Sequence, residues 1–299
     1  MKSGVLVIDK PAGMTSHDVV DQMRRRFGQR RVGHGGTLDP DATGVLLVGL
    51  GTATRFLSYA QTGPKSYRAE AMLGVSTTTQ DASGEVVSER PVAVGRRDVE
   101  AALKSLEGEI DQTPPMVSAV KVGGERLYRK ARRGEDVARP ARRVTVYDIR
   151  LHDFAEGDRP QITFTVRCSG GTFVRTLAHD LGERLGCGAH LTFLRRTEAG
   201  GFSEGEAVAL DEVTEDDVRP LSDAVRPLPR VAPGPAAARA VLSGKPLPRG
   251  DLAVEEGAPV AVIAGEELLG VYVRRGDVLR ADRVVPPSEA PAALRVGSP

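Results

Sequence analysis

Short apolar runs of strand length and segments with helical periodicity alternate along the first 200 residues. Residues 66–73 alternate apolar and polar positions, which places Tyr67 and the apolar residues after it on one face of a strand. Further strands are predicted at 4–10, 45–51, 143–151, 160–169 and 190–200, and helices at 17–28, 52–60, 99–110 and 171–186. Because the order lacks a strict strand–helix–strand rhythm, the pattern favours a mixed α+β fold over a doubly wound sheet.

The first predicted helix has clear signals at both ends. Ser16 is a favourable N-cap, Val19, Val20 and Met23 form an apolar stripe, and Gly28 ends the helix. The predicted helix at 171–186 likewise ends at a glycine.

The last third of the chain differs in composition. Residues 204–223 hold eight acidic side chains against one basic one, and the Pro-rich stretch 225–235 is typical of a linker. Residues 258–285 alternate short apolar runs with glycine and charged turns, which predicts a small β-barrel-like domain. We therefore expect a large domain over 1–230, a small β-rich domain over 231–290 and a tail over 291–299.

Composition excludes several classes of protein. No run of 18 apolar residues occurs, and the N-terminus turns polar after one strand-length apolar stretch, so neither a membrane span nor a signal peptide is expected. A cytoplasmic protein is the resulting expectation. Cys168 and Cys187 form no CxxC or His–Cys cluster, so we expect no disulfide framework and no metal site.

Positive charge is concentrated in the first two thirds of the chain. Residues 1–203 carry 30 Lys and Arg against 24 Asp and Glu, whereas residues 204–299 carry 11 against 16. The segment 112–143, called the basic insertion below, contributes strongly, because its residues 121–143 hold nine basic and three acidic side chains. This distribution makes the large domain the candidate for binding a polyanion.

Two aspartates in the segment HGGTLDPDATGVLL (34–47) are the first candidates for chemistry. Asp39-Pro-Asp41-Ala-Thr43 matches the pattern of magnesium-dependent phosphotransferases that form an aspartyl-phosphate. In those enzymes the first aspartate follows a buried strand, and the preceding GHGGTL does not have that pattern. A simpler alternative is that both aspartates cap the following turn.

Three other residues favour a functional role for the two aspartates. His34 lies in the Gly-rich approach, where the backbone can come close to a ligand. Arg175 starts a predicted helix directly after two glycines and would hold a buried carboxylate ionised. Tyr67 lies at the mouth of the alternating strand, between Lys65 and Arg68.

The segments that contain these residues resemble the bacterial tRNA pseudouridine synthase B family, the TruB type. The resemblance runs almost continuously from residue 4 to about residue 200. It is carried by LVIDKPAGMTSHDVV (6–20), RVGHGGTLDPDATGVL (31–46), KSYRAEAMLG (65–74), TTQDASGEV (78–86), CSGGTFVRTLAHDLG (168–182) and GAHLTFLRR (188–196). It implies a mixed, largely antiparallel pseudouridine-synthase sheet flanked by helices, with a PUA-like domain over 231–290.

The resemblance also implies an activity, the isomerisation of uridine 55 in the T-loop of tRNA to pseudouridine without a cofactor. Asp39 aligns with the catalytic aspartate of the family, which either attacks the ribose C1′ or assists glycosidic cleavage through a glycal route. Arg175 would pair with Asp39 and keep it anionic. Tyr67 would stack on the flipped base and remove the C5 proton, and Asp81 would either bond near the active site or cap its own turn.

The resemblance further implies a set of RNA contacts. His34 would occupy the stack that the flipped uridine leaves, and Lys10 and Lys65 are candidates for phosphate contacts. The basic insertion resembles the mobile segment of the family that closes over the RNA, and its candidate contacts are Arg126, Arg129, Lys130 and Arg132. The PUA-like domain would contact the acceptor end of tRNA.

Two other classes of protein share parts of this pattern. One is an RNA-binding or RNA-folding protein with the same fold and no catalysis. Such a protein would have no need for a buried carboxylate paired with an arginine. The other is the guide-RNA-dependent catalytic subunit of archaea and eukaryotes, which is disfavoured because this chain lacks long Lys-rich tails. We expect a monomer whose partner is the tRNA T-stem-loop, with no guide RNA and no membrane contact.

Overall fold

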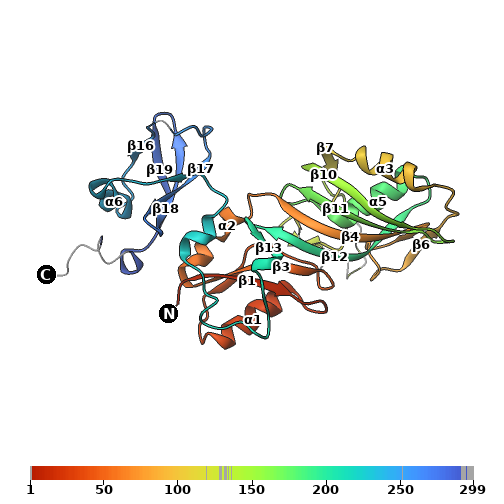
Figure 1. The fold of residues 1–299 in the computed structure, drawn as a ribbon, viewed down its shortest axis with the longest axis horizontal. Coiled ribbons are helices and arrows are strands. Elements are labelled where there is room, and N and C mark those ends of the chain that lie inside the picture. The colour runs from red at the N-terminus through yellow and green to blue at the C-terminus, as the bar shows by residue number, and fades with distance from the viewer. Residues whose placement is uncertain are drawn as a thin grey trace.

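The computed structural model describes residues 2–118, 120–127, 130, 133, 135, 137–250, 252–290 and 294, and only the backbone at 121, 122 and 126. Within these residues, a ten-stranded mixed sheet forms the centre of the larger domain (Figure 1). Its strands follow the order β14 (Val208–Ala209), β1 (Gly4–Lys10), β3 (Thr43–Leu50), β12 (Ala189–Ala199), β4 (Lys65–Leu73), β11 (Gln161–Cys168), β10 (Arg142–Ala155) and β7 (Gly108–Gln112). Strand β2 (Val32–His34) pairs with β3, and β13 (Phe202–Ser203) pairs with β12.

The pairing confirms the predicted fold class. Strand β1 pairs in parallel with β14 and β12 with β3, whereas the other neighbours in this sheet are antiparallel. Two short hairpins lie outside the sheet, β5 (Val75–Thr77) with β6 (Val86–Glu89) and β8 (Lys121–Val122) with β9 (Glu125–Arg126).

The continuous apolar runs of β1 and β3 are explained by burial on both faces. Leu6 and Ile8 of β1 pack into the main core beneath helix α1 (Ser16–Arg26). Val5 and Val7 point to the opposite face, into a second core that the C-terminal domain shares. Strand β4 instead buries alternate residues, and Tyr67 lies on its core-facing side, as the alternation predicted.

Helices α1, α3 (Arg96–Lys104) and α5 (Val174–Arg184) pack against the sheet (Figure 1). The prediction that Ser16 caps α1 was wrong. Thr15 is the N-cap and forms a capping box with Asp18. Ser16 is the first helical residue, and its buried hydroxyl bonds to the backbone of Leu38 instead.

The helix predicted over 99–110 also differs from the structure. Helix α3 ends at Lys104, and the last residues of that stretch belong to β7, which starts at Gly108. Gly108 has a φ of +95°, a conformation that glycine adopts without a steric cost. Short helices η1 (Gly51–Arg55) and α2 (Leu57–Ala60) replace the single helix expected over 52–60.

The C-terminal domain contains a second sheet, in the order β15 (Arg230–Val231), β17 (Pro259–Ala264), β18 (Glu267–Arg275), β19 (Val278–Val284) and β16 (Leu247–Pro248). Helix α6 (Pro235–Leu242) packs against β18 and β19. The Pro-rich stretch 225–235 is therefore not a free linker, since β15 lies within it and pairs in parallel with β17.

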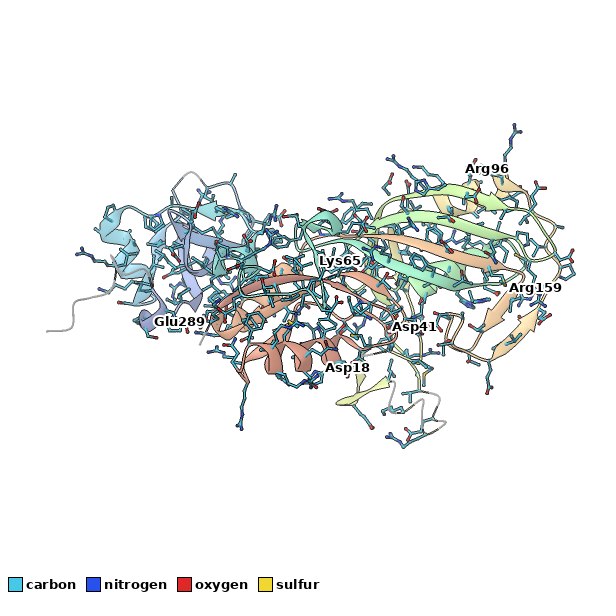
Figure 2. The ribbon with its side chains drawn as sticks, turned by 60° about the horizontal axis from the view of Figure 1, so that its bottom comes forward. Asp18, Asp41, Lys65, Arg96, Arg159 and Glu289 are labelled. Atoms are coloured by element: carbon cyan, nitrogen blue, oxygen red, sulfur yellow. The ribbon has the colours of Figure 1, made fainter. Side chains whose placement is uncertain are left out.

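The two domains meet through a shared core and through polar contacts. Thr52 donates a hydrogen bond to Glu289 at 2.6 Å, and Arg55 donates to the carbonyl oxygen of Val284 at 3.3 Å. Tyr59 donates to Asp282 across the same junction. Glu289 is labelled at this junction in Figure 2. No helix in the part of the chain that the structure describes is long and apolar enough to span a membrane.

Candidate active site

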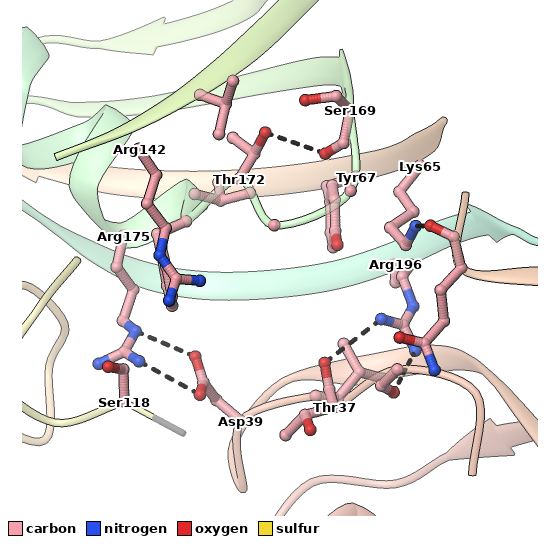
Figure 3. Close-up of a pocket in the computed structure, with 18 of the residues that line it drawn as sticks. Thr37, Asp39, Lys65, Tyr67, Ser118, Arg142, Ser169, Thr172, Arg175 and Arg196 are labelled. Carbon is pink, nitrogen blue, oxygen red and sulfur yellow. Dashed lines mark hydrogen bonds and ion pairs between the residues drawn. The ribbon is translucent and has the colours of Figure 1, made fainter. Parts of the chain in front are cut away.

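A cavity of about 800 Å³ opens where the loop before β3 meets the N-terminus of α5. Its wall includes Asp39, Tyr67 and Arg175, so the structure brings together the three residues predicted to be catalytic (Figure 3). Asp39 and Arg175 lie on one side of the cavity, and Tyr67 lies on the other with Lys65 and Arg196. The chain thus builds one polar chamber from segments that are far apart in the sequence.

Asp39 lies in a tight turn between β2 and β3, and its carbonyl oxygen accepts a hydrogen bond from the Ala42 N–H at 3.1 Å. This position is not the end of a buried strand, which aspartyl-phosphate chemistry would need. The Ser16 hydroxyl accepts from the Leu38 N–H at 2.9 Å, which fixes the residue before Asp39. Asp41, by contrast, is exposed.

Lys10 fixes the other side of this turn. Its ammonium group is fully buried and donates to the carbonyl oxygens of Pro11, Met14 and Pro40 at 2.7, 2.7 and 2.9 Å. Burial lowers the pKa of Lys10 to about 8, while the neighbouring charges of Asp41 and Asp39 oppose this shift. Three carbonyls use the three N–H groups of Lys10, so in this conformation the side chain has none left for a phosphate.

Arg175 is the centre of the charged network. It lies in the first turn of α5 with only 5% of its side chain exposed. Its Nε and Nη2 contact the two carboxylate oxygens of Asp39 at 3.0 and 3.2 Å. Nη2 also donates to the Val117 carbonyl at 2.9 Å, and Nη1 contacts the Thr79 carbonyl at 3.1 Å and Asp81 at 3.3 Å. These five contacts match the five N–H groups of a guanidinium.

Two opposing effects act on the Asp39 carboxylate. Burial within the cavity wall raises the pKa of Asp39 above its ordinary value, although 41% of the side chain is exposed to solvent. The charge and hydrogen bond of Arg175 act against this effect, and the charge of Asp81 adds to it. Asp39 is therefore a partly exposed carboxylate with a raised pKa, and Arg175 favours its ionised form.

Asp81 combines the two roles that the sequence left open. One carboxylate oxygen accepts from the Ser83 N–H at 3.0 Å and from the Thr79 hydroxyl at 2.5 Å, which caps the turn between β5 and β6. The other oxygen contacts Arg175. Asp81 thus couples the hairpin to the arginine that holds Asp39.

Tyr67 and Lys65 are both buried on the opposite wall. Burial raises the pKa of Tyr67, while the positive charge of Arg196 opposes this. The Lys65 ammonium group donates to the carbonyl oxygens of Gln61 and Gly63 at 2.8 and 3.0 Å, and burial lowers its pKa to about 8. This wall therefore carries buried positive charge beside a buried phenol.

The base of the basic insertion is attached to α5 by a contact that sequence reasoning missed. Gln112 is 1% exposed, and its side chain donates to the Phe173 carbonyl at 3.1 Å and accepts from the Phe173 N–H at 2.9 Å. Phe173 is the N-cap of α5, two residues before Arg175. The two partners are 61 residues apart, and no spacing pattern signals such a pair.

Comparison with known proteins identifies the family. Residues 24–174 match the N-terminal domain of the TruB family pseudouridylate synthases, and residues 175–231 match the C-terminal domain of tRNA pseudouridylate synthase B. The chain belongs to the TruB family of pseudouridylate synthases. The resemblance found in the sequence is thereby confirmed.

Relatives within the family match most of the chain. A tRNA pseudouridine synthase B of Thermobifida fusca is 50% identical over 246 residues, which cover 79% of this chain and 84% of that protein. That of Streptococcus gordonii is 42% identical over 293 residues, which cover 94% and 99%. Among solved structures, a Cbf5–Nop10–Gar1 complex contains a chain with a TM-score of 0.74 and 30% identity, covering 95% of this chain and 85% of that one.

The other predicted RNA contacts of this TruB-family chain lie in different places. His34 is half-buried on β2, two residues before the part of the loop that lines the cavity. Lys65 lines the cavity itself. In the basic insertion, Lys130 is half-buried, whereas Arg129, Arg132 and the side chain of Arg126 lie outside the described residues.

Two arginines that the sequence analysis did not single out lie beside the cavity. Arg142 and Arg143 begin β10 at the end of the basic insertion, are exposed, and line the cavity opening. Their only sequence signal is the local excess of positive charge, which does not distinguish them from the other basic residues of the insertion.

Proposed function

We propose that this chain isomerises uridine 55 in the T-loop of tRNA to pseudouridine by base flipping, with Asp39 as the catalytic carboxylate. Family membership and the names of the relatives support pseudouridine formation in tRNA, and the position and the residue roles are part of the proposal. The observation that carries the residue assignment is the two-atom contact between Arg175 and Asp39 inside a cavity that also holds Tyr67.

The reaction requires an ionised carboxylate beside the sugar. In one route the Asp39 carboxylate attacks C1′, the bond from C1′ to N1 breaks, and the bonding electrons leave with uracil. In the glycal route Asp39 accepts the C2′ proton while the same bond breaks. In both routes the base then turns. In the first route C5 attacks C1′ and displaces the Asp39 carboxylate, and in the glycal route C5 bonds to C1′ while Asp39 returns the proton to C2′. In both routes the C5 proton is finally removed and N1 gains a proton.

The walls of the cavity support the remaining roles. Uracil must stay trapped while it turns, and an enclosed chamber between Asp39 and Tyr67 would prevent its loss. Tyr67 would stack on the base, a contact that is typically worth about 1–3 kcal/mol, and its phenol oxygen would accept the C5 proton. Lys65 and Arg196 would favour the negative charge that uracil carries while it is detached.

Binding of the T-loop requires eversion of the uridine, at a cost of a few kcal/mol. His34 would take the vacated place in the stack. Arg142 and Arg143 at the cavity opening, together with the basic insertion, would contact phosphates, so the affinity should fall as salt rises. The C-terminal β domain, as a PUA-like module, would contact the acceptor end of the tRNA.

The test is conversion of uridine to pseudouridine in an unmodified tRNA T-stem-loop, by purified protein with EDTA and without a guide RNA. The wild type should convert the uridine at position 55, and Asp39→Asn should bind the RNA without converting it. Asp41→Asn is the matched control and should remain active, because Asp41 is exposed outside the cavity wall.

Other results would favour the alternatives. Tight binding without conversion by the wild type would favour an RNA-binding protein with this fold. Conversion only after a guide RNA is added would favour the guide-dependent branch, and loss of activity in EDTA would show a metal requirement.

A further inference from the structure

Arg196 is among the largest fully buried side chains in the structure, with 1% exposure, and it lies in the wall of the active-site cavity. Its guanidinium donates to the Val45 carbonyl at 2.8 Å through Nε, to the Thr37 carbonyl at 3.4 Å through Nη1, and to the Gly36 carbonyl at 3.3 Å through Nη2. Gly36 and Thr37 are the residues of the loop that leads to Asp39. One buried side chain therefore holds the backbone on which the carboxylate depends.

The same guanidinium lies beside Tyr67. Arg196 of β12 and Tyr67 of β4 are direct cross-strand partners in the antiparallel ladder. Figure 3 shows both side chains on the wall opposite Arg175, with the Arg196 contacts to the loop drawn as dashed lines. The guanidinium thus stands between the loop before Asp39 and the phenol.

The backbone at Arg196 is packed closely against the neighbouring strand β3. Gly44, its partner on β3, has a φ of +97°, and a Cβ there would lie 2.2 Å from the Arg196 carbonyl oxygen. Strand β12 is therefore pressed directly onto β3, and the Cα of Arg196 has a fixed position from which its long side chain extends.

The charge of Arg196 is not neutralised by a neighbour. Among the described residues, no carboxylate lies within ion-pair distance of its guanidinium, which donates to neutral carbonyl oxygens. A buried cation without an anion is costly, so it is unlike the surface pairs that occur elsewhere on the chain. Its positive charge acts on Tyr67 and on Lys65.

We propose that Arg196 is a positioning residue that fixes the loop of Asp39 and the phenol of Tyr67 at the same time, with its unpaired charge directed at Tyr67. The Tyr67 part of this proposal rests on the proposed function. An arginine suits the role because its planar fork presents three N–H directions to three carbonyls, whereas a lysine would supply a point charge.

The groups that face Tyr67 determine how its proton responds to the loss of Arg196. Arg196 on β12 favours the phenolate, whereas Cys168 on β11 and Asp39 on the loop disfavour it. Removal of Arg196 therefore raises the pKa of Tyr67 further. If the phenolate accepts the C5 proton, the variant has less phenolate at every pH below the Tyr67 pKa, so it should be slower than the wild type by a similar factor throughout that range.

The experiment is single-turnover pseudouridine formation in tRNA by Arg196→Met, Arg196→Lys and the wild type, between about pH 6 and pH 9.5. Formation is followed by tritium release from tRNA labelled at C5 of uridine. Arg196→Met should be slower by about 100-fold at neutral pH, the order expected when reacting groups are misplaced by about 1 Å. Because this range lies below the raised pKa of Tyr67, both rates should rise in parallel with pH. Arg196→Lys should recover part of the rate and keep the wild-type pH dependence, because the charge remains.

Arg195→Met is the matched control, since Arg195 is the next residue on β12 and pairs with Asp9 and Glu204 outside the cavity. It should be less stable yet keep the shape of the wild-type pH profile. The proposal is overturned if Arg196→Met stays within about threefold of the wild type, or if Arg196→Lys is no faster than Arg196→Met. Because tritium release reports total conversion, pseudouridine at a position other than 55 would overturn the proposed site and leave this test intact.

Discussion

The protonation of Asp39 should determine the acid side of the pH–rate profile. The reaction needs the ionised form, and burial raises the pKa of Asp39, so activity should be lost as the pH falls through a value above the ordinary 3.8 of aspartate. Arg175 lowers this pKa, so Arg175→Lys, which weakens the two-atom contact, should move the acid limb to higher pH. Single-turnover rates across the acid range measure this. If the acid limb of Arg175→Lys coincides with that of the wild type, Arg175 does not keep Asp39 ionised.

Lys10 should contribute to stability and not to RNA affinity. Lys10→Met leaves three buried carbonyls without a donor, which should lower the free energy of unfolding by about 2–4 kcal/mol. Urea denaturation measures this loss. The slope of log affinity for tRNA against log salt should be unchanged, whereas Arg142→Met, at the exposed cavity opening, should reduce that slope by about one. If Lys10→Met reduces the salt slope as Arg142→Met does, Lys10 contacts phosphate.

At this scale the sequence predicts the residues of the proposed active site better than those that support them. Asp39, Tyr67 and Arg175 lie in recognisable motifs, and the structure places them around one cavity. Ser16 and Lys10 lie in equally clear motifs, but each makes a hydrogen bond to a distant backbone group, Ser16 to Leu38, 22 residues away, and Lys10 to Pro40, 30 residues away. Such contacts follow from the closure of the fold, so spacing along the chain cannot reveal them.

At the scale of whole elements, the contact between Gln112 and Phe173 should couple the basic insertion to α5. Gln112→Ala leaves the Phe173 N–H without its partner and removes one of the two hydrogen bonds at the Phe173 carbonyl, which still accepts from the Leu177 N–H at 3.1 Å. The substitution should lower the free energy of unfolding by about 1–3 kcal/mol. Because Phe173 caps the helix that carries Arg175, the single-turnover rate should fall as well. Gln112→Glu, which keeps an acceptor for the Phe173 N–H, should lose less rate. Equal rates in Gln112→Ala and the wild type would mean that the contact between Gln112 and Phe173 does not influence Arg175.

The elements that the sequence misassigned share a physical cause. Residues 99–110 keep a helical spacing of apolar positions, yet α3 ends at Lys104 because residues from Gly108 onward gain a partner strand in β10. The Pro-rich stretch 225–235 contains β15 for the same reason, since β17 supplies the partner. Strand pairing depends on residues far along the chain, whereas the end signals of α1 and α5 are local, and those helices were predicted within a few residues.

For the whole molecule, the shared core makes the two domains one cooperative unit. Val5, Val7 and Phe56 of the larger domain pack in the same buried cluster as Ile263 and Val271 of the C-terminal sheet. A module tethered by a linker would leave these side chains exposed. Here they are removed from water by the other domain, and full burial of such a side chain is worth about 1.5–3 kcal/mol.

Thermal unfolding of the intact chain should therefore show a single transition in calorimetry. A chain truncated after residue 231 should melt at a lower temperature and bind a dye that reports exposed apolar surface, because it loses the C-terminal part of the shared core. Tyr59→Phe is a control for the polar contacts, since it removes the bond to Asp282 and leaves the apolar cluster in place, so its melting temperature should fall far less.

Two separate transitions in the intact chain, with the lower one unaffected by truncation, would show that the domains unfold independently. A rigid junction of this kind would hold the C-terminal β domain at a fixed distance from Asp39, which the proposed contact of that domain with the acceptor end of tRNA requires.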